Sequence, residues 1–317
     1  EAMNLHTTQA TYNVALGFSA LKNMTTADDN IAIGRSASVS TTTGYSNVGI
    51  GPASFYYNVT GYGAVAIGQN AGYSFGRGGG HSPVGSVFVG NTAGYYATGS
   101  HNVFVGFETG KGGTSGTPYS KNVAIGYQAL NAFTSGNENV ILGYQAGNNM
   151  TTGYKNIAIG HQAKAGTVAY DNIVLGRGAG AGLTSGYKNI IIGSLALAGH
   201  NGVQNIAIGH QAMGGGSTGV DNAIIMGFQA AYNINSADAD GTIAIGAQAG
   251  GNITSGIGNI AIGYQALNAE DDGDYNTAIG YQALLNQAGS SGEVGNTALG
   301  YQAGKALTSG IRNTIVG

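Results

Sequence analysis

The chain of 317 residues contains no cysteine, no tryptophan and only three prolines. The lack of cysteine excludes disulfides and thiolate metal sites. Charged residues make up 8% of the chain and the net charge is −3, which excludes both a basic surface for nucleic acid and the charge excess of a disordered chain. No apolar run approaches about 18 residues, so the sequence predicts no membrane span.

One glycine recurs at a nearly constant interval along the chain, which has 59 glycines in all. It closes a pentad of the form Asn-apolar-Ala-apolar-Gly, and most intervals are 17 residues, as between Gly17 and Gly34. A fixed short period is typical of repeat proteins whose units stack on one another. We call these residues the anchor glycines: Gly17, Gly34, Gly51, Gly68, Gly90, Gly106, Gly126, Gly143, Gly160, Gly176, Gly193, Gly209, Gly227, Gly246, Gly263, Gly280, Gly300 and Gly317.

Each repeat has room for one short strand and two turns. Ile157 and Ile159 flank Ala158 in a representative pentad, which predicts a strand with the isoleucines on one face and the alanine on the other. The anchor glycine and a second glycine-containing stretch, such as residues 151–153, supply the turns. The sequence therefore predicts an all-β fold, a parallel β-solenoid or β-roll of about eighteen 17-residue rungs with isoleucine and valine inside.

An asparagine opens most pentads. In stacked coils these side chains lie above one another, and amide ladders of this kind stabilise in-register strands. We therefore expect a ladder along one corner of the coil. Its predicted members are Asn30, Asn47, Asn139, Asn156, Asn172, Asn189, Asn205, Asn259, Asn276, Asn296 and Asn313.

The alanine at the centre of the pentad predicts self-association. This second face of the strand is expected to be polar in a solenoid that stands alone, yet it is apolar. Small side chains let a partner approach closely, so we expect the coils to associate side by side as a homotrimer. A wider monomeric solenoid whose own turns cover this face is the alternative. The predicted interface residues are Ala32, Ala66, Ala124, Ala158, Ala207, Ala244, Ala261, Ala278 and Ala298.

Several pentads continue into Tyr-Gln-Ala, as in residues 143–147 and 263–267. With this extension the chain resembles the repeats of phage tail-fibre proteins, and it is similar to the head repeats of trimeric autotransporter adhesins. The resemblance implies a left-handed, trimeric, parallel β-roll that projects from a virion tail or a cell surface. The repeat here is longer than the adhesin-head repeat, and Tyr-Gln-Ala stands where that family has small polar residues.

Insertions lengthen the period at four places. The sequence predicts one repeat domain over residues 1–317, expected to be a segment of a longer chain because it stops on a complete pentad. Loops on a rigid scaffold commonly carry recognition residues, so we expect a receptor-facing patch on the first two insertions. The insertions are residues 70–86, 107–121, 228–241 and 283–295. The predicted receptor-facing residues are Phe75, Arg77, His81, Lys111 and Tyr119.

Aromatic side chains follow many anchor glycines, and stacked rungs arrange them in columns. An exposed tyrosine column suits sugar rings, since each ring has a flat apolar face and a hydroxyl; alternatively, the rings cover corners and interchain clefts. Four Asn-X-Thr sequons are predicted glycosylation sites if the organism glycosylates secreted proteins, although the tripeptide also arises by chance in Asn/Thr-rich turns. They begin at Asn23, Asn58, Asn149 and Asn252.

Catalytic and metal-binding patterns are weak. The G-x-S-x-G string at residues 215–219 lies in a turn with no helix after it. His161 and His210 share a repeat position but lie about 14 Å apart, too far to hold one metal within a chain. Acidic clusters at residues 28–29, 238–240 and 270–274 lack EF-hand spacing, and they are either solvated loops or Ca²⁺ ligands. We predict no enzyme, no cofactor and no metal.

The sequence thus predicts a non-enzymatic extracellular fibre that acts as a structural shaft and as an attachment element of a phage tail or a cell surface. Its predicted partners are further copies of itself and a surface glycan or receptor. Two alternatives stay open. One is a filament subunit that polymerises end to end, possible also in a glycosylated form; the other is a β-helix polysaccharide depolymerase, which needs paired carboxylates in a cleft.

Overall fold

The computed structural model describes residues 10–77, 82–113, 118–216, 219–288 and 292–317. The chain is an all-β parallel β-solenoid of about 17 turns with almost no helix, as the glycine period predicts. It divides into two compact units, Glu1–Asn156 and Ile157–Gly317. The assignment of residues 1–317 to one repeat domain stays a prediction.

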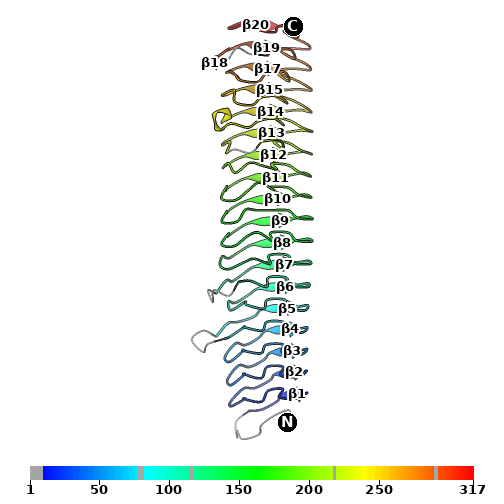
Figure 1. The fold of residues 1–317 in the computed structure, drawn as a ribbon, viewed down its shortest axis with the longest axis vertical. Helices are drawn as coiled ribbons and strands as arrows, with labels where there is room; N and C mark the ends of the chain where they lie inside the picture. The colour runs from blue at the N-terminus through cyan, green and yellow to red at the C-terminus, as the bar shows by residue number, and fades with distance from the viewer. Residues whose placement is uncertain (1–9, 78–81, 114–117, 217–218, 289–291) are drawn as a thin grey trace. The chain divides into compact units, whose positions relative to one another are not determined.

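In the first unit, the pentads form three-residue strands that stack in parallel (Figure 1). Equivalent residues pair from rung to rung, as Val123 pairs with Val140 and Ala124 with Ile141. The strands are β1 (Val14–Leu16), β2 (Ile31–Ile33), β3 (Val48–Ile50), β4 (Val65–Ile67), β5 (Val87–Val89), β6 (Val103–Val105), β7 (Val123–Ile125) and β8 (Val140–Leu142).

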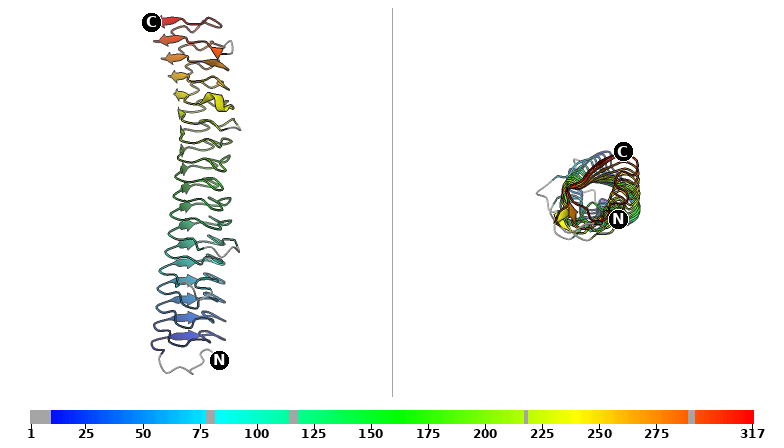
Figure 2. Two further views of the ribbon diagram at one scale, coloured as in Figure 1. Left: turned by 90° about the vertical axis from the view of Figure 1, so that its left-hand side faces the viewer. Right: turned by 90° about the horizontal axis from the view of Figure 1, so that it is seen from above.

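The second unit repeats this arrangement, with its strands aligned along one side of the coil (Figure 2). The strands are β9 (Ile157–Ile159), β10 (Ile173–Leu175), β11 (Ile190–Ile192), β12 (Ile206–Ile208), β13 (Ile224–Met226), β14 (Ile243–Ile245), β15 (Ile260–Ile262), β17 (Thr277–Ile279), β19 (Thr297–Leu299) and β20 (Thr314–Val316). The insertion at residues 228–241 adds the 3₁₀ turn η1 (Ala237–Ala239). A small parallel pair joins β16 (Gly273–Asp274), in a rung of regular length, to β18 (Gly292–Glu293), in the insertion at residues 283–295.

The prediction that isoleucine and valine point inward and alanine outward is wrong, because the structure has the opposite arrangement. Ala158 is fully buried within its own coil, whereas Ile157 is half-buried and Ile159 is 38% exposed. The coil is narrow, and Leu, Phe and Met side chains from the turns fill it, as Leu130 and Phe133 do beside Ala124. Where such side chains fill the coil, only a small residue fits at the centre of the strand, and the larger flanking residues point outward.

The predicted interface of alanines is therefore wrong. All nine have no exposed surface in the single chain, so none of them is available to a partner. These residues are Ala32, Ala66, Ala124, Ala158, Ala207, Ala244, Ala261, Ala278 and Ala298. The apolar surface that does remain outside belongs to the flanking isoleucines and valines.

The anchor glycines are required by backbone geometry. Gly126 has φ +134°, which L side chains rarely adopt, and an added Cβ would collide with the carbonyl of Gly143 on the next coil. Other sharp bends use ordinary residues in the left-handed region, where Lys121, Gln128 and Leu130 have φ of 59°, 51° and 55°. Each such residue carries a backbone cost of about 1–2 kcal/mol, which the stacking of coils offsets.

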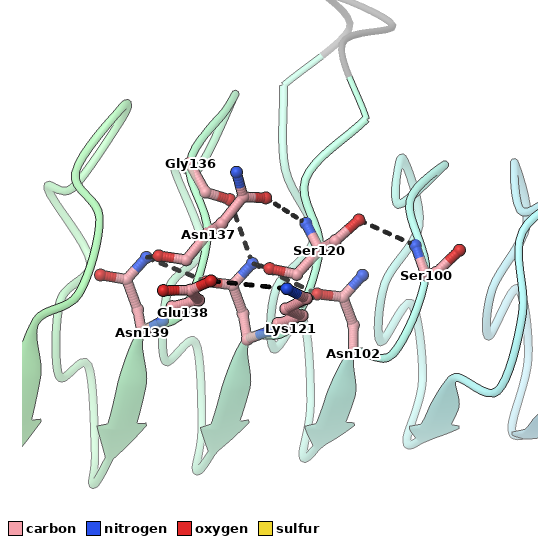
Figure 3. Close-up of polar contacts among 9 residues, drawn as sticks. Ser100, Asn102, Ser120, Lys121, Gly136, Asn137, Glu138 and Asn139 are labelled. Carbon is pink, nitrogen blue, oxygen red and sulfur yellow. Dashed lines mark hydrogen bonds and ion pairs between the residues drawn. The ribbon is translucent and has the colours of Figure 1, made fainter.

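The predicted asparagine ladder is confirmed (Figure 3). Asn139 Nδ2 donates to Asn122 Oδ1 at 2.9 Å, and Asn122 Nδ2 donates to Asn102 Oδ1 at 3.2 Å. The same oxygens accept the main-chain N–H of the following asparagine, both at 3.1 Å. These asparagines are fully buried, so the ladder satisfies backbone groups that the interior would otherwise leave unpaired.

Two positions of the same rung share the interior volume: the centre of the strand and the fourth residue after the anchor glycine. In several rungs, a large side chain at one is accompanied by a small side chain at the other. Where the centre of the strand is Phe88 or Phe104, the fourth residue after the anchor glycine is Gly94 or Gly110, and a Cβ on either glycine would collide with that ring. Where the centre is Ala124, the corresponding residue is the buried Leu130. Close packing tolerates either pair because the summed volume stays similar.

Candidate functional site

The outer face of the strands, which we call the strand side, is a regular surface of each unit. It carries the first and third residue of every strand, nearly all of them isoleucine, valine or leucine. Ile67 and Ile125 are 40% and 42% exposed in the first unit, and Ile173 is 37% exposed in the second. Exposed apolar side chains at neighbouring rungs make the strand side a candidate interaction surface.

Aromatic columns border the strand side, as predicted. The rings of Phe107, Tyr127 and Tyr144 stack with centroid separations of 5.4 and 5.2 Å, and each is more than two-fifths exposed. In the second unit Tyr264, Tyr281 and Tyr301 stack in the same way, at 5.2 and 5.4 Å. The columns extend the apolar strand side with rings that also present hydroxyl groups to solvent.

A ladder of glutamines follows the aromatic columns, one residue later in the repeat. Gln145 Nε2 donates to Gln128 Oε1 at 3.0 Å in the first unit. In the second unit, Gln265 donates to Gln248 and Gln282 to Gln265, at 2.9 and 3.0 Å. These amides therefore bind one another, as the ladder interpretation of the sequence expects.

The predicted receptor-facing patch is wrong for its two aromatic residues. Phe75 is fully buried and packs on Phe55 and Phe88, with ring centroids 5.3 and 5.6 Å away. Tyr119 is 1% exposed, and its hydroxyl donates to the carbonyl of Gly110 at 3.1 Å. Both insertions fold their rings inward because the hydrophobic effect favours filling the coil over exposing a large ring.

The other predicted residues of the patch lie outside the core. Arg77 is exposed, with its guanidinium carbon 4.8 Å from the centre of the Tyr57 ring. Lys111 Nζ forms an ion pair with Glu108 Oε1 at 2.8 Å, and hydrogen bonds from Lys111 and Gln128 lower the pKa of that carboxyl. His81 lies outside the described residues. A receptor role for Arg77 and Lys111 stays a prediction.

One of the four sequons is incompatible with glycosylation of the folded chain. Asn58 is fully buried, and its side chain both accepts from the N–H of Gly61 at 2.8 Å and donates to its carbonyl at 3.3 Å. A glycan has no room there. Asn23 and Asn252 are exposed and Asn149 is half-buried, so glycosylation at these three stays a prediction.

Hydrogen bonds of two acidic residues connect neighbouring coils, and those of a third lie within its own turn. Asp28 Oδ1 accepts the N–H of Thr11 at 2.6 Å, and Asp274 Oδ1 accepts that of Ile257 at 2.8 Å. The buried Glu270 accepts from the N–H groups of Asp271 and Gly273, at 3.1 and 2.9 Å. Within the described ranges, no group of three His, Cys, Asp or Glu side chains is placed to hold a metal ion.

A polar groove that the sequence did not indicate lies on another side of the second unit. This side, which we call the second side, carries the fifth and sixth residues after each anchor glycine. Two cavities of about 260 and 410 Å³ adjoin there and share Asn233 and Asn252 in their walls. Gln229, Tyr232 and Asn268 line the first cavity, and Thr254 and Asp271 line the second.

Comparison of the chain with the known protein families and with curated proteins finds no match in either. The sequence carries no distinct signal for the groove, because asparagines also occupy the same repeat positions in the first unit, at Asn131, Asn148 and Asn149. Among the described residues, no helix is long and apolar enough to cross a membrane.

Proposed function

We propose that the chain is the shaft of a non-enzymatic extracellular fibre, in which parallel copies pack their strand sides together as a homotrimer. The observation that carries this proposal is the row of exposed aliphatic side chains along the strand side of each unit, exemplified by Ile125 and Ile159 at 42% and 38% exposure. Leaving such a surface in water is costly, at about 25 cal/mol per Å² of apolar area. A second and third copy offer a surface with the same period.

The fibre is proposed to act at a surface, as an attachment element of a phage tail or a cell. Support comes from the construction of the coil, in which each rung pairs its backbone with its neighbours through β-bridges and side-chain ladders. Such stacking holds exposed side chains at fixed spacing within each unit, which suits repeated contacts with a partner. The resemblance to tail-fibre and adhesin-head repeats favours the same role.

Analytical ultracentrifugation combined with electron microscopy of the purified chain tests the proposal. We expect a trimer with threefold symmetry, and we expect Ile125→Lys and Ile159→Lys to weaken its association. The matched control is Val168→Lys, which changes a residue that is 48% exposed but lies in a turn rather than on the strand side. A stable monomeric wild type contradicts the proposal, and filaments of indefinite length favour the polymerising subunit instead.

A further inference from the structure

The walls of the polar groove consist mainly of amides. Asn233 Nδ2 donates to Asn252 Oδ1 at 2.8 Å, and Asn268 Nδ2 donates to the main-chain oxygen of Gln248 at 2.8 Å. These bonds fix the planes of the amides and occupy only part of their donors and acceptors, because each amide has two N–H groups and two lone pairs. A neighbouring pair of hydroxyls, which each donate and accept, matches such an amide.

The first cavity coincides with a break in the glutamine ladder. Gln229 Nε2 donates to Gln211 Oε1 at 3.0 Å, and Gln265 Nε2 donates to Gln248 Oε1 at 2.9 Å. Within the described part of the chain, the corresponding bond between Gln229 and Gln248 is missing, and both residues line the cavity. The break leaves Gln229 Oε1 as an acceptor and Gln248 Nε2 as a donor at this cavity.

An aromatic ring stands at the same place. Tyr232 lines the first cavity and is partly exposed. Gly215, in the wall of the second cavity, packs closely on Tyr232: a Cβ on that glycine would come within 2.5 Å of the main-chain oxygen of Tyr232 and within 3.1 Å of its ring. A side chain at position 215 would therefore crowd the tyrosine. A flat apolar face with a hydroxyl at its edge is suited to a sugar ring.

The charges of the residues that line the groove indicate the net charge of the ligand that fits it. Of the described residues that line it, Asp271 alone is charged, and its carboxylate accepts a hydrogen bond from Thr254 Oγ1. A basic side chain, the common partner of phosphate, sulfate and carboxylate groups, is not among them. A single carboxylate also differs from the pair that glycoside hydrolysis uses. The groove therefore suits a neutral ligand that is bound without being cleaved.

We propose that this groove binds a neutral oligosaccharide chain, with one sugar unit in each cavity and the Asn233–Asn252 pair between them. The two cavities are near the lower end of the range of ligand pockets, about 300–1,000 Å³. This inference rests on the proposed attachment function, for which it names the class of ligand.

The test is binding of the whole chain, produced in a host without N-glycosylation so that Asn252 carries no glycan. The probes are immobilised linear oligosaccharides of glucose, mannose, galactose and N-acetylglucosamine, beside sialylated and sulfated chains, followed by calorimetry on the strongest binder. We expect a neutral chain to bind, and we expect Asn252→Ala and Tyr232→Ala each to weaken it by about tenfold or more. Asn23→Ala is the matched control, since Asn23 is exposed and has the same repeat position outside the groove.

Three results overturn the inference: no binding of any neutral chain, preference for an acidic chain, or unchanged affinity in both groove variants. Circular dichroism melting of each variant verifies that a loss of binding is not a loss of fold. The proposed fibre fails separately. If the wild type is monomeric but still binds a neutral chain through Asn252, the groove proposal stands and the trimeric fibre proposal is wrong. If the chain is a trimer that attaches to cells equally well with Asn252→Ala, the fibre proposal stands and the groove proposal is wrong.

Discussion

The two units fill the same coil with different side chains. In the first unit the interior holds a series of rings, including Phe55, Phe88 and Phe104, with centroids 6.2 and 5.8 Å apart along the series. In the second, the described interior is aliphatic, with Ile191 and Leu267 among its fully buried residues. The backbone repeat is nevertheless the same, which teaches that the coil depends on the volume within each rung rather than on particular residues.

The second side differs more. At three neighbouring rungs of the first unit it is covered by tyrosines: Tyr56, Tyr73 and Tyr95 stack with centroids 5.0 and 4.5 Å apart. At three neighbouring rungs of the second unit, the equivalent positions include Tyr232, Asn233, Asn252 and Asn268, which line the groove. Side chains on this side do not have to fill the interior, so they can vary without affecting the coil. This freedom is what a recognition surface requires.

The largest expected effect is one that the two units share. Gly126→Ala in the first unit and Gly263→Ala in the second each place a Cβ against a carbonyl of the next coil, at φ of +134° and +133°. We expect each to lower the free energy of unfolding by about 4 kcal/mol or more. Denaturant unfolding monitored by circular dichroism measures this.

The control for the anchor glycines is Gly241→Ala. That glycine has φ +73° and no atom within 4 Å of an added Cβ, so only the backbone cost of about 1–2 kcal/mol applies. Equal losses at Gly126, Gly263 and Gly241 would show that the contact between coils is unimportant.

The difference between the interiors is tested by converting one rung into the other type. Phe88→Ala creates a cavity and is expected to cost about 3–5 kcal/mol. Adding Gly94→Leu copies the Ala124 and Leu130 pair of a later rung, where Leu130 has φ 55° and Gly94 has φ 60°. We expect the double variant to recover more than half of the loss.

Gly94→Leu alone is the second single variant of the double-mutant cycle that Phe88→Ala begins. It is expected to be destabilising, because its side chain collides with the Phe88 ring. Denaturation midpoints of the two single variants and the double variant measure the coupling. If the losses in free energy of unfolding of the two single variants simply add in the double variant, the two positions do not share the interior volume of the rung.

The tyrosine-covered side predicts a pH dependence in the first unit. Burial, with further contributions from Tyr95 and Tyr57, raises the pKa of Tyr73 from 10.0 to about 12. Because the folded state disfavours the phenolate, this contribution to stability is fully present below pH 10 and is lost as the pH rises through about 12. Melting temperatures at increasing pH measure it.

Tyr73→Phe is the comparison for the alkaline loss. The variant lacks the ionising hydroxyl, so its melting temperature is expected to fall less than that of the wild type over the same pH range. In an ultraviolet titration of tyrosinate, the variant is expected to show one ionising group fewer than the wild type at high pH, the group with a pKa of about 12. Identical pH profiles for the two proteins would refute the role of Tyr73.

The smallest effect concerns exposed residues in the left-handed region. Lys155, in the first unit, has φ 56° and an exposed side chain, so Lys155→Gly is expected to stabilise the chain by about 1 kcal/mol. Asn222, in the second unit, has φ 58°, but asparagine tolerates this conformation, so Asn222→Gly is expected to gain less. Thermal unfolding measures both, and an equal gain would contradict the strain argument.

Much of the fold follows from the repeat. The anchor glycines, the strand at each pentad, the asparagine ladder and the stacking of Tyr127 on Tyr144 are all predicted from a period near 17 residues. The groove is not, because it depends on three neighbouring rungs that bring Tyr232, Asn252 and Asn268 together. Nothing in the local sequence distinguishes these asparagines from those of an ordinary turn.

The sequence by itself determined that the chain coils, where it turns and which residues lie above one another, because a constant period repeats every local preference at the same place in each rung. Only the tertiary structure decided which face of the strand is inside. Alternation in a strand separates Ala158 from Ile157 and Ile159 without saying which of them points inward. That choice depends on the space left by turn residues such as Leu130 and Phe133, and the same competition for volume draws Phe75 and Tyr119 into the core.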